Sequence, residues 1–162
     1  MSKPNTSLKV LIGAAALVAA ASTIPMSAFA GECPAGEVGV DVTPPGPSQA
    51  SGVTDDVLAS IDIANEPAAI AGRLFRLRRL AIQPGGVVSW HDHGDRPALI
   101  YIVSGSITEY RSTCAVPIEH KAGEVSVENH EIKHWWKNNT DQPTVLIASD
   151  LLPDAMKGDN TM

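Results

Sequence analysis

The sequence predicts an all-β fold, a sandwich or barrel of short strands preceded by an extended N-terminal arm. Beyond residue 60, short runs rich in Val, Ile, Leu and aromatic residues are separated by turn residues about every eight to twelve positions. The separating stretches are rich in Gly, Ser, Pro and Asn, which accept the backbone angles of sharp turns. No internal repeat is evident, which argues against a solenoid or propeller.

The first thirty residues have the layout of a secretory signal peptide. Lys3 and Lys9 stand near the start, an apolar run extends from Val10 to Ala21, and Ala28-Phe29-Ala30 forms a cleavage site before Gly31. The apolar run is shorter than the roughly 20 residues that a bilayer-spanning helix needs. We therefore expect a periplasmic or secreted protein with no membrane anchor after cleavage.

Length and charge limit the functions that the mature chain can have. Removing residues 1–30 leaves 132 residues, which suit one domain, and changes the formal net charge from −6 to −8. An acidic chain lacks the positive charge that binds nucleic acid or an anionic membrane, so neither is an expected partner. The sequence also has no Gly-rich phosphate loop, no nucleophile elbow and no CxxC pair.

Two cysteines, Cys33 and Cys114, remain after cleavage, and an exported protein meets an oxidising compartment. A disulfide between them would close a loop of about 80 residues and stabilise the fold by ~3 to 5 kcal/mol in the chain-entropy model. The alternative is two free thiols. Neither cysteine has the surroundings expected of a nucleophile.

The expected order along the mature chain is an arm, a barrel and a tail. Residues 31–60 form the arm, and its stretch from Thr43 to Gly52 is dense in Pro, Gly and Ser. Thr54 is a suitable N-cap for one short helical turn from Asp55 to Ser60. The barrel then occupies residues 61–153, and residues 154–162 form a C-terminal tail.

The barrel strands follow from the apolar runs and the turns between them. Pro84-Gly85-Gly86 is one expected turn. The arginine-rich segment Arg73 to Arg79 is expected to present a solvated strand face, and the alternative is an inward arginine that pairs with an anionic substrate. The expected strands are Leu74–Ile82, Val87–His93, Ala98–Val103, Ile107–Arg111, Val125–Glu128, Lys133–Lys137 and Thr144–Leu151.

Three histidines form the most distinctive chemical pattern. Side chains alternate across a strand, so His91 and His93 point to the same face and can bind one ion together. His134 lies on a later strand that can bring a third imidazole beside them. Three nitrogen ligands with open positions are what a catalytic metal site requires. His120 and His130 occupy strand-end and turn positions, where solvated histidines are expected.

The spacing of these residues resembles the two motifs of the cupin family. The first motif, G-x5-H-x-H-x3,4-E-x6-G, is met at Gly85, His91, His93 and Gly105. The second, G-x5-P-x-G-x2-H-x3-N, is met at Gly123, His134 and Asn138. The resemblance covers roughly Leu74 to Leu151. It implies a single double-stranded β-helix barrel, also called a jelly roll, with a metal ion inside.

Two departures from the motifs matter for the metal. The glutamate ligand of the family falls at Ala98, and the Pro and Gly of the second motif are replaced by Asn129 and Glu131. The motif itself therefore supplies three histidines at most, an arrangement that resembles the thiol dioxygenases. Asp95, Glu109 and Glu128 are the carboxylates considered as a substitute fourth ligand. Fe2+ is the favoured ion, and Zn2+, Mn2+ and Ni2+ are alternatives.

A small-molecule pocket is expected beside this site. Trp136 and Asn138 share strand parity with His134, so either can face the cavity, although core packing is the simpler interpretation of Trp136. Tyr101 is a third candidate for the pocket.

The sequence leaves three functional hypotheses open. One is a dioxygenase-type metalloenzyme acting on a small chelating or anionic substrate, with a zinc hydrolase as a variant. The second is a non-catalytic protein that binds a metal ion or small metabolite. The third is a structural role in which the Pro-rich arm is exchanged between the subunits of a homodimer.

Overall fold

The computed structural model describes residues 31–157. The predicted signal peptide, residues 1–30, and the end of the predicted tail, residues 158–162, lie outside the described residues. Within residues 31–157 no helix has the length and apolar character needed to cross a membrane.

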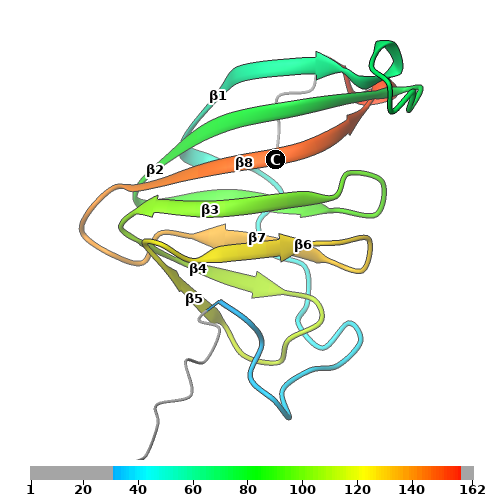
Figure 1. Cartoon of the computed structure of the whole chain (residues 1–162). Helices are drawn as coiled ribbons and strands as arrows, with labels where there is room; N and C mark the ends of the chain where they lie inside the picture. The colour runs from blue at the N-terminus through cyan, green and yellow to red at the C-terminus, as the bar shows by residue number, and fades with distance from the viewer. Residues whose placement is uncertain (1–30, 158–162) are drawn as a thin grey trace, which may run out of the picture.

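Eight antiparallel strands and two single 3-10 turns make up the described chain (Figure 1). The strands are β1 (Ser51–Asp62), β2 (Arg73–Asp92), β3 (Ala98–Ser104), β4 (Ser106–Arg111), β5 (Ile118–Lys121), β6 (Val125–Glu128), β7 (Lys133–Lys137) and β8 (Thr144–Pro153). The 3-10 turns are η1 (Ile63–Asn65) and η2 (Asp154–Met156). The prediction of an all-β fold is confirmed, and β1 and β5 are the two strands that were not expected.

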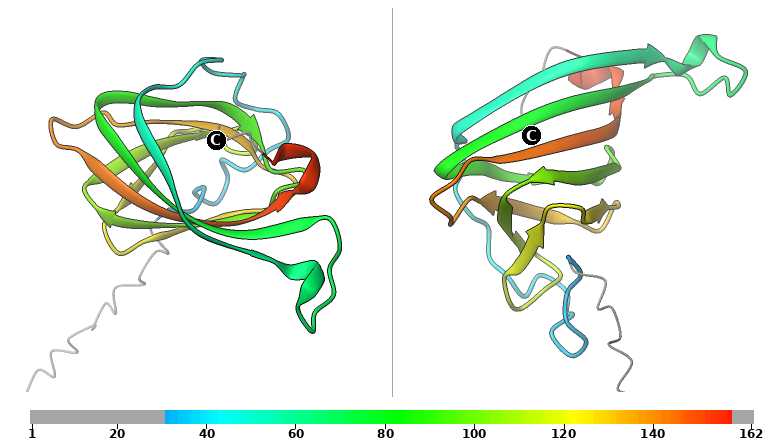
Figure 2. Two further views of the ribbon diagram at one scale, coloured as in Figure 1. Left: turned by 90° about the horizontal axis from the view of Figure 1, so that it is seen from above. Right: turned by 60° about the vertical axis from the view of Figure 1, so that its left-hand side comes forward.

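The strands form one sheet that curves into a nearly closed barrel (Figure 2). Their order is β5-β4-β7-β2-β8-β3-β6. Strand β1 stands outside this order and pairs with β2 alone. Strand β2 is long enough to serve two neighbours, because its first half pairs with β8 and its second half with β7. The loop between β1 and β2 projects beyond the sheet (Figures 1 and 2).

The predicted turn at Pro84-Gly85-Gly86 is wrong, because β2 runs through it as one strand with a bend. Gly85 has a φ of 74°, a conformation that glycine adopts without strain. The backbone groups of the bend remain paired, with the N–H of Gly85 donating to Asn138 at 2.9 Å and Asn138 donating back to Gly86 at 3.0 Å. Glycine and proline therefore mark a corner of the barrel here and not the end of a strand.

The predicted helical turn from Asp55 to Ser60 is also wrong, since these residues belong to β1. Ten Cα pairs join β1 to β2, from Ser51 opposite Val87 to Asp62 opposite Leu74. This long ladder outweighs the local capping preference of Thr54. The side chain of Asp55 reaches Arg78 on β2 at 2.6 Å. The sheet therefore begins at Ser51, within the stretch that was expected to be the arm.

The barrel interior has an apolar end and a polar end. The apolar core contains Leu80, Ile82, Val88, Ala98, Ile100, Ile102, Ile107, Trp136, Leu146 and Ala148. Along β8 the inward side chains change from Leu146 and Ala148 to Asp150, and along β3 they end at Ala98. The polar end is therefore built on the same strands as the core, which holds its side chains in fixed positions.

The N-terminal arm is fastened to the barrel by the predicted disulfide. Cys33 and Cys114 are bonded with an S–S distance of 2.02 Å, which confirms the expected pairing. Val38 forms an isolated bridge with Cys114, and Gly39 donates to the carbonyl of Thr113 at 3.0 Å. The arm therefore lies along the β4–β5 end of the sheet.

Candidate metal centre

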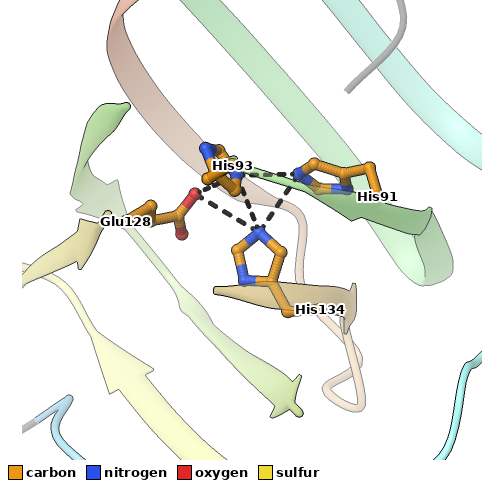
Figure 3. A group of neighbouring side chains, drawn as sticks. All are labelled: His91, His93, Glu128 and His134. Atoms are coloured by element: carbon orange, nitrogen blue, oxygen red, sulfur yellow. Dashed lines mark hydrogen bonds and ion pairs between the residues drawn. The ribbon is translucent and has the colours of Figure 1, made fainter. Parts of the chain in front are cut away.

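Sheet register brings the three predicted histidines together. His91 on β2 is the direct Cα partner of His134 on β7, and His93 lies just past the end of β2. The Nε2 atom of His91 lies 3.1 Å from that of His93 and 3.1 Å from that of His134. The Nε2 atoms of His93 and His134 are 3.0 Å apart. All three rings thus point to one place inside the barrel (Figure 3).

A carboxylate joins them from the position beside Ala98. Glu128 on β6 is the Cα partner of Ala98 on β3, so its side chain starts from the neighbouring strand at the same level. Its Oε2 lies 2.7 Å from Nε2 of His93 and 3.3 Å from Nε2 of His134. We call His91, His93, His134 and Glu128 the four-donor centre; their donor atoms lie within 4.8 Å of one another.

The other two carboxylates considered as substitutes do not join the centre. Asp95 is exposed and paired with Arg73 at the surface. Glu109 is buried, but its Oε1 contacts Nδ1 of His134 at 2.5 Å, on the side of the ring away from the centre. Glu128 is therefore the fourth donor in this geometry.

Hydrogen bonds on the outer side of each ring set the tautomers. Nδ1 of His91 lies 2.8 Å from the carbonyl of Ser89, and Nδ1 of His93 lies 2.8 Å from that of Arg96. Nδ1 of His134 faces the Glu109 carboxylate. Oxygens of these kinds only accept, so each Nδ1 carries a proton, and each ring in its neutral form presents the lone pair of Nε2 to the centre.

A metal ion fits this arrangement of donors. When the three rings are neutral, their Nε2 lone pairs face one another at 3.0 to 3.1 Å and repel unless a cation lies between them. Both oxygens of Glu128 are buried without a hydrogen-bond partner among the described residues, and Oε2 faces Nε2 of His93 and of His134. Three imidazoles and one carboxylate form a donor set that divalent transition metals accept.

Glu109 anchors the outer side of the centre. Its Oε2 accepts from Nε2 of His120 at 2.8 Å, and Arg111 donates to both of its oxygens at 2.7 and 2.9 Å. Together with Nδ1 of His134, four N–H groups therefore surround the fully buried carboxylate of Glu109. Carboxylates that hold the far nitrogen of a ligand histidine fix its orientation and raise its basicity.

The pKa values of the metal-free residues reflect this crowding. Burial lowers the pKa of His134, but the carboxylates of Glu128 and Glu109 outweigh it and raise the value to about 9. Burial and the charge of His134 hold the pKa of His91 well below its ordinary value. Burial raises the pKa of Glu128, yet the neighbouring His134 and His93 outweigh it and hold that pKa well below the ordinary value.

An arginine cluster lies next to the centre. Asp150 on β8 is the Cα partner of both Arg76 and Ala98, so it stands between β2 and the position beside Glu128. Arg76 donates to its two oxygens at 3.0 and 2.8 Å. Arg78 and Arg96 each approach Asp150 to 3.4 Å. The prediction that this arginine-rich segment is a solvated face is wrong for Arg76 and Arg78, which are both buried.

A pocket of about 650 Å³ opens beside the centre. His91 and Arg96 both line it, so it borders the four-donor centre and the arginine cluster together. The other lining residues are Ser48, Gln49, Ala50, Ser89, Trp90, Asp92, Leu152 and Met156. Part of the Pro-rich arm thus forms one wall of the pocket.

None of the three residues predicted to line a substrate pocket lines this pocket beside the centre. Trp136 is buried in the apolar core, where it stacks on His120 with ring centroids 4.7 Å apart. The amide of Asn138 donates to the carbonyls of Ile82 and Gln142 and accepts from Thr140, so it is used in the β7–β8 turn. Tyr101 is 45% exposed on the outer face of β3, and the expectation that it lines the interior is wrong.

The two remaining histidines differ from each other. The side chain of His130 is 76% exposed, as expected for a turn. His120 is fully buried, which contradicts the expected solvated position. The strand that carries it, β5, was not predicted; the alternation of Ile118 and His120 on its inner face is the signal that sequence reasoning missed.

Comparisons with known proteins agree with this fold. The family model described as "Cupin domain" matches residues 78–150, the stretch that contains all four donors. No curated protein matches the chain.

Solved structures of low sequence identity have the same fold. A predicted oxalate decarboxylase from Thermotoga maritima is 19% identical with a TM-score of 0.52, covering 71% of this chain and 97% of that one. KdgF from Halomonas sp. is 15% identical with a TM-score of 0.50, covering 65% and 84%. The Cnp3 cupin domain from Schizosaccharomyces pombe is 14% identical with a TM-score of 0.50, covering 67% and 69%.

Proposed function

Because this chain belongs to the cupin family, we propose that it is an exported metalloenzyme that binds one divalent transition metal in its four-donor centre. Its substrate would be a small anion that chelates the metal. The observation that carries the proposal is the convergence of three Nε2 lone pairs and one carboxylate on a single buried point.

The kinds of donor favour a divalent transition metal. Three imidazoles and one carboxylate would hold Fe2+, with Mn2+, Ni2+ and Zn2+ as alternatives.

The four donors leave room for a chelating substrate. His91, His93, His134 and Glu128 would supply four ligands, and a metal that accepts more than four could also bind a substrate. Glu128 contacts His93 and His134, whereas no ion pair joins it to His91 (Figure 3). Since Glu128 is the one anionic donor, a bound divalent ion keeps a net positive charge, which favours an anionic ligand.

The arginine cluster supports an anionic substrate independently of the metal. The guanidinium groups of Arg76, Arg78 and Arg96 are buried around the carboxylate of Asp150, and Arg78 also pairs with Asp55. Positive charge gathered beside a pocket raises the local concentration of anions and favours an anionic ligand. Arg96 lines the pocket, so a substrate carboxylate bound there is close to both Arg96 and the centre.

The protein residues have defined tasks in such a reaction. A metal bound in the centre supplies Lewis-acid and, for iron or manganese, redox chemistry. The three carbonyl or carboxylate contacts on Nδ1 keep the ligand rings oriented. Arg96 would hold the substrate carboxylate, and the apolar core around Ile100 and Leu146 excludes water from the inner side.

Export is supported by two features. The N-terminal segment has the charge, apolar run and cleavage site of a signal peptide. The disulfide between Cys33 and Cys114 is of a kind that persists in the periplasm or outside the cell and is rare in the cytosol.

Turnover of small carboxylates tests the proposed function. Protein stripped of metal and reloaded with Fe2+ or Mn2+ should consume oxygen or release CO2 with at least one member of a panel of short dicarboxylates and hydroxy acids. Oxalate belongs in the panel because a structure of similar fold is named a predicted oxalate decarboxylase.

Arg96→Gln should raise KM for the active compound, whereas Arg79→Gln, on the exposed face of β2, should not. Loaded protein that turns over none of the panel would contradict the enzyme proposal.

One observation favours a binding protein as the second candidate. Among the residues that line the pocket, Asp92 is the only carboxylate, so general acid–base groups are scarce there. A binding protein would show the same metal content and would bind a carboxylate probe without converting it. Isothermal titration with oxalate, followed by recovery of the unchanged compound, distinguishes the two candidates.

A further inference from the structure

His120 is a buried imidazole with only one of its nitrogens satisfied. Its Nε2 donates to Oε2 of Glu109 at 2.8 Å, because a carboxylate accepts. In the neutral ring Nδ1 then carries a lone pair. That atom is buried and has no hydrogen-bond partner among residues 31–157. A buried acceptor without a donor loses its hydrogen bond to water and gains none in return, so a further donor is expected at this place.

Gly31 lies directly against this nitrogen. It is buried, its φ is 98°, and a Cβ built on it would lie 2.6 Å from Nδ1 of His120. Any side chain here would therefore collide with the imidazole, and the backbone angle is one that glycine adopts. Since the amino nitrogen shares its Cα with that Cβ, it lies within about 5 Å of Nδ1. The carbonyl of Val125 is 3.6 Å from the same Cβ position.

Gly31 is also the residue that follows the expected cleavage site, Ala28-Phe29-Ala30. Cleavage there would create a new α-amino group at Gly31. An α-amino group is largely protonated near neutral pH and carries three N–H donors. A peptide nitrogen at the same position has one N–H, which is held in the plane of its peptide bond.

We propose that the α-amino group of Gly31, released by signal cleavage, is the hydrogen-bond donor to Nδ1 of His120. The mature N-terminus would then be hydrogen-bonded to a buried residue of the barrel. The carbonyl of Val125, which also lies near Gly31, would be a second acceptor for this amine. The disulfide at Cys33, two residues further on, keeps the segment in place.

This contact would connect the N-terminus to the metal centre. The chain of hydrogen bonds runs from the Gly31 amine to His120, from His120 to Glu109, and from His134 to Glu109. Each link is a buried pair, and the last residue is a donor of the centre. Removal of the signal peptide would thus complete the support of His134 after export. The inference depends on the proposed cleavage and holds whether or not the centre catalyses a reaction.

Two forms of the protein test the proposal, one starting at Gly31 and one retaining Ala30. Both are prepared without metal, so that the result does not depend on the proposed activity. The Gly31 form should melt several degrees higher, because it gains a buried hydrogen bond. Its α-amine should react about tenfold more slowly with an acylating reagent when folded than when unfolded in urea, as followed by mass spectrometry. Equal melting temperatures, or an amine equally reactive in both states, would overturn the proposal.

A double-mutant cycle assigns the effect to His120. His120→Phe keeps a ring against Trp136 but removes both nitrogens. The stability difference between the Gly31 and Ala30 forms should disappear in this background and persist with His130→Phe, at an exposed position. Persistence of the full difference in His120→Phe would contradict the proposal. If His120→Phe does not fold, the acylation rate of the unsubstituted Gly31 form decides the question.

Discussion

Glu128 on β6 occupies the place directly across the sheet from Ala98 on β3, the position where the family motif has its glutamate. Cross-strand partners have Cβ atoms about 4.5 to 5.5 Å apart, so a carboxylate can move from one strand to the next and still reach the same point. The carboxylate of the metal centre is thus kept in space although it is lost from the motif.

This relationship predicts that the carboxylate can be moved back. Glu128→Ala should weaken metal binding by at least about tenfold, because one anionic ligand is lost. Adding Ala98→Glu to that variant should restore most of the affinity, since the new side chain starts from the partner position. Metal affinity measured by competition with a chelator checks both variants.

The matched control for this exchange is Glu119→Ala, which removes an exposed carboxylate from β5. It should leave metal affinity unchanged. A double variant with the same low affinity as Glu128→Ala would show that Glu128 does not act in place of the motif glutamate.

Glu109 is expected to act through His134. Glu109→Gln keeps the shape of the side chain but removes the charge that holds Nδ1 of His134 and pairs with Arg111. Loss of such a support typically lowers metal affinity about 10- to 100-fold. Chelator competition measures the change, and Glu119→Gln serves as the exposed control. Unchanged affinity in Glu109→Gln would mean that His134 is oriented without it.

The raised pKa of His134 makes the metal-free protein sensitive to alkali. Its ordinary value is 6.5 and its value in the folded state is about 9, so folding favours the protonated ring. This contribution to stability is fully present below pH 6.5 and is lost as the pH rises through 9. His91, whose pKa is lowered, acts oppositely, and stability rises with pH up to about 6.5. Melting curves with a chelator should therefore show a falling Tm on the alkaline side of neutrality.

His134→Gln provides the comparison, because it should flatten the alkaline part of that profile. The same pKa predicts that metal binding near neutral pH displaces about one proton from His134. Calorimetry in two buffers with different ionisation enthalpies counts this proton. A Tm that is constant toward alkaline pH, together with binding that releases no proton, would contradict the assigned protonation.

Asp150 is expected to be essential for folding. Asp150→Asn would remove the buried carboxylate that Arg76, Arg78 and Arg96 share. Breaking a buried ion pair in this way costs about 3 to 5 kcal/mol. Urea denaturation should show the loss, and an added small dicarboxylate should recover part of it if the cluster binds anions. Asp154→Asn, which removes a half-exposed carboxylate, is the control.

The sequence was sufficient for the parts of the fold that depend on alternation and spacing. Strands β3, β4, β6 and β7 were predicted within one residue of their ends, because each is a run of alternating side chains between turn residues. The three histidines were predicted from strand parity and motif spacing. Their convergence depends on one sheet register, His91 opposite His134.

Other features depend on long-range pairing that local patterns do not contain. The N-cap signal of Thr54 predicted a helical turn, yet the ladder with β2 makes the segment a strand. The arginines of β2 were predicted to face solvent. Arg76 is instead buried against Asp150, which lies more than seventy residues further along the chain. The identity of the fourth donor likewise could not be predicted, because Asp95, Glu109 and Glu128 are all carboxylates close enough to the motif to be considered. The pairing of Ala98 with Glu128 decides among them.

Elemental analysis tests the central claim most directly. The protein should be purified from its native compartment without added metal and without a metal-binding tag, beside His91→Ala, His134→Ala and Glu128→Ala. We expect about one divalent transition-metal ion per chain in the unsubstituted protein and in the exposed control His130→Ala, and a large loss in the three centre variants. Unsubstituted protein that is folded but free of metal, or centre variants that keep full metal content, would contradict the account.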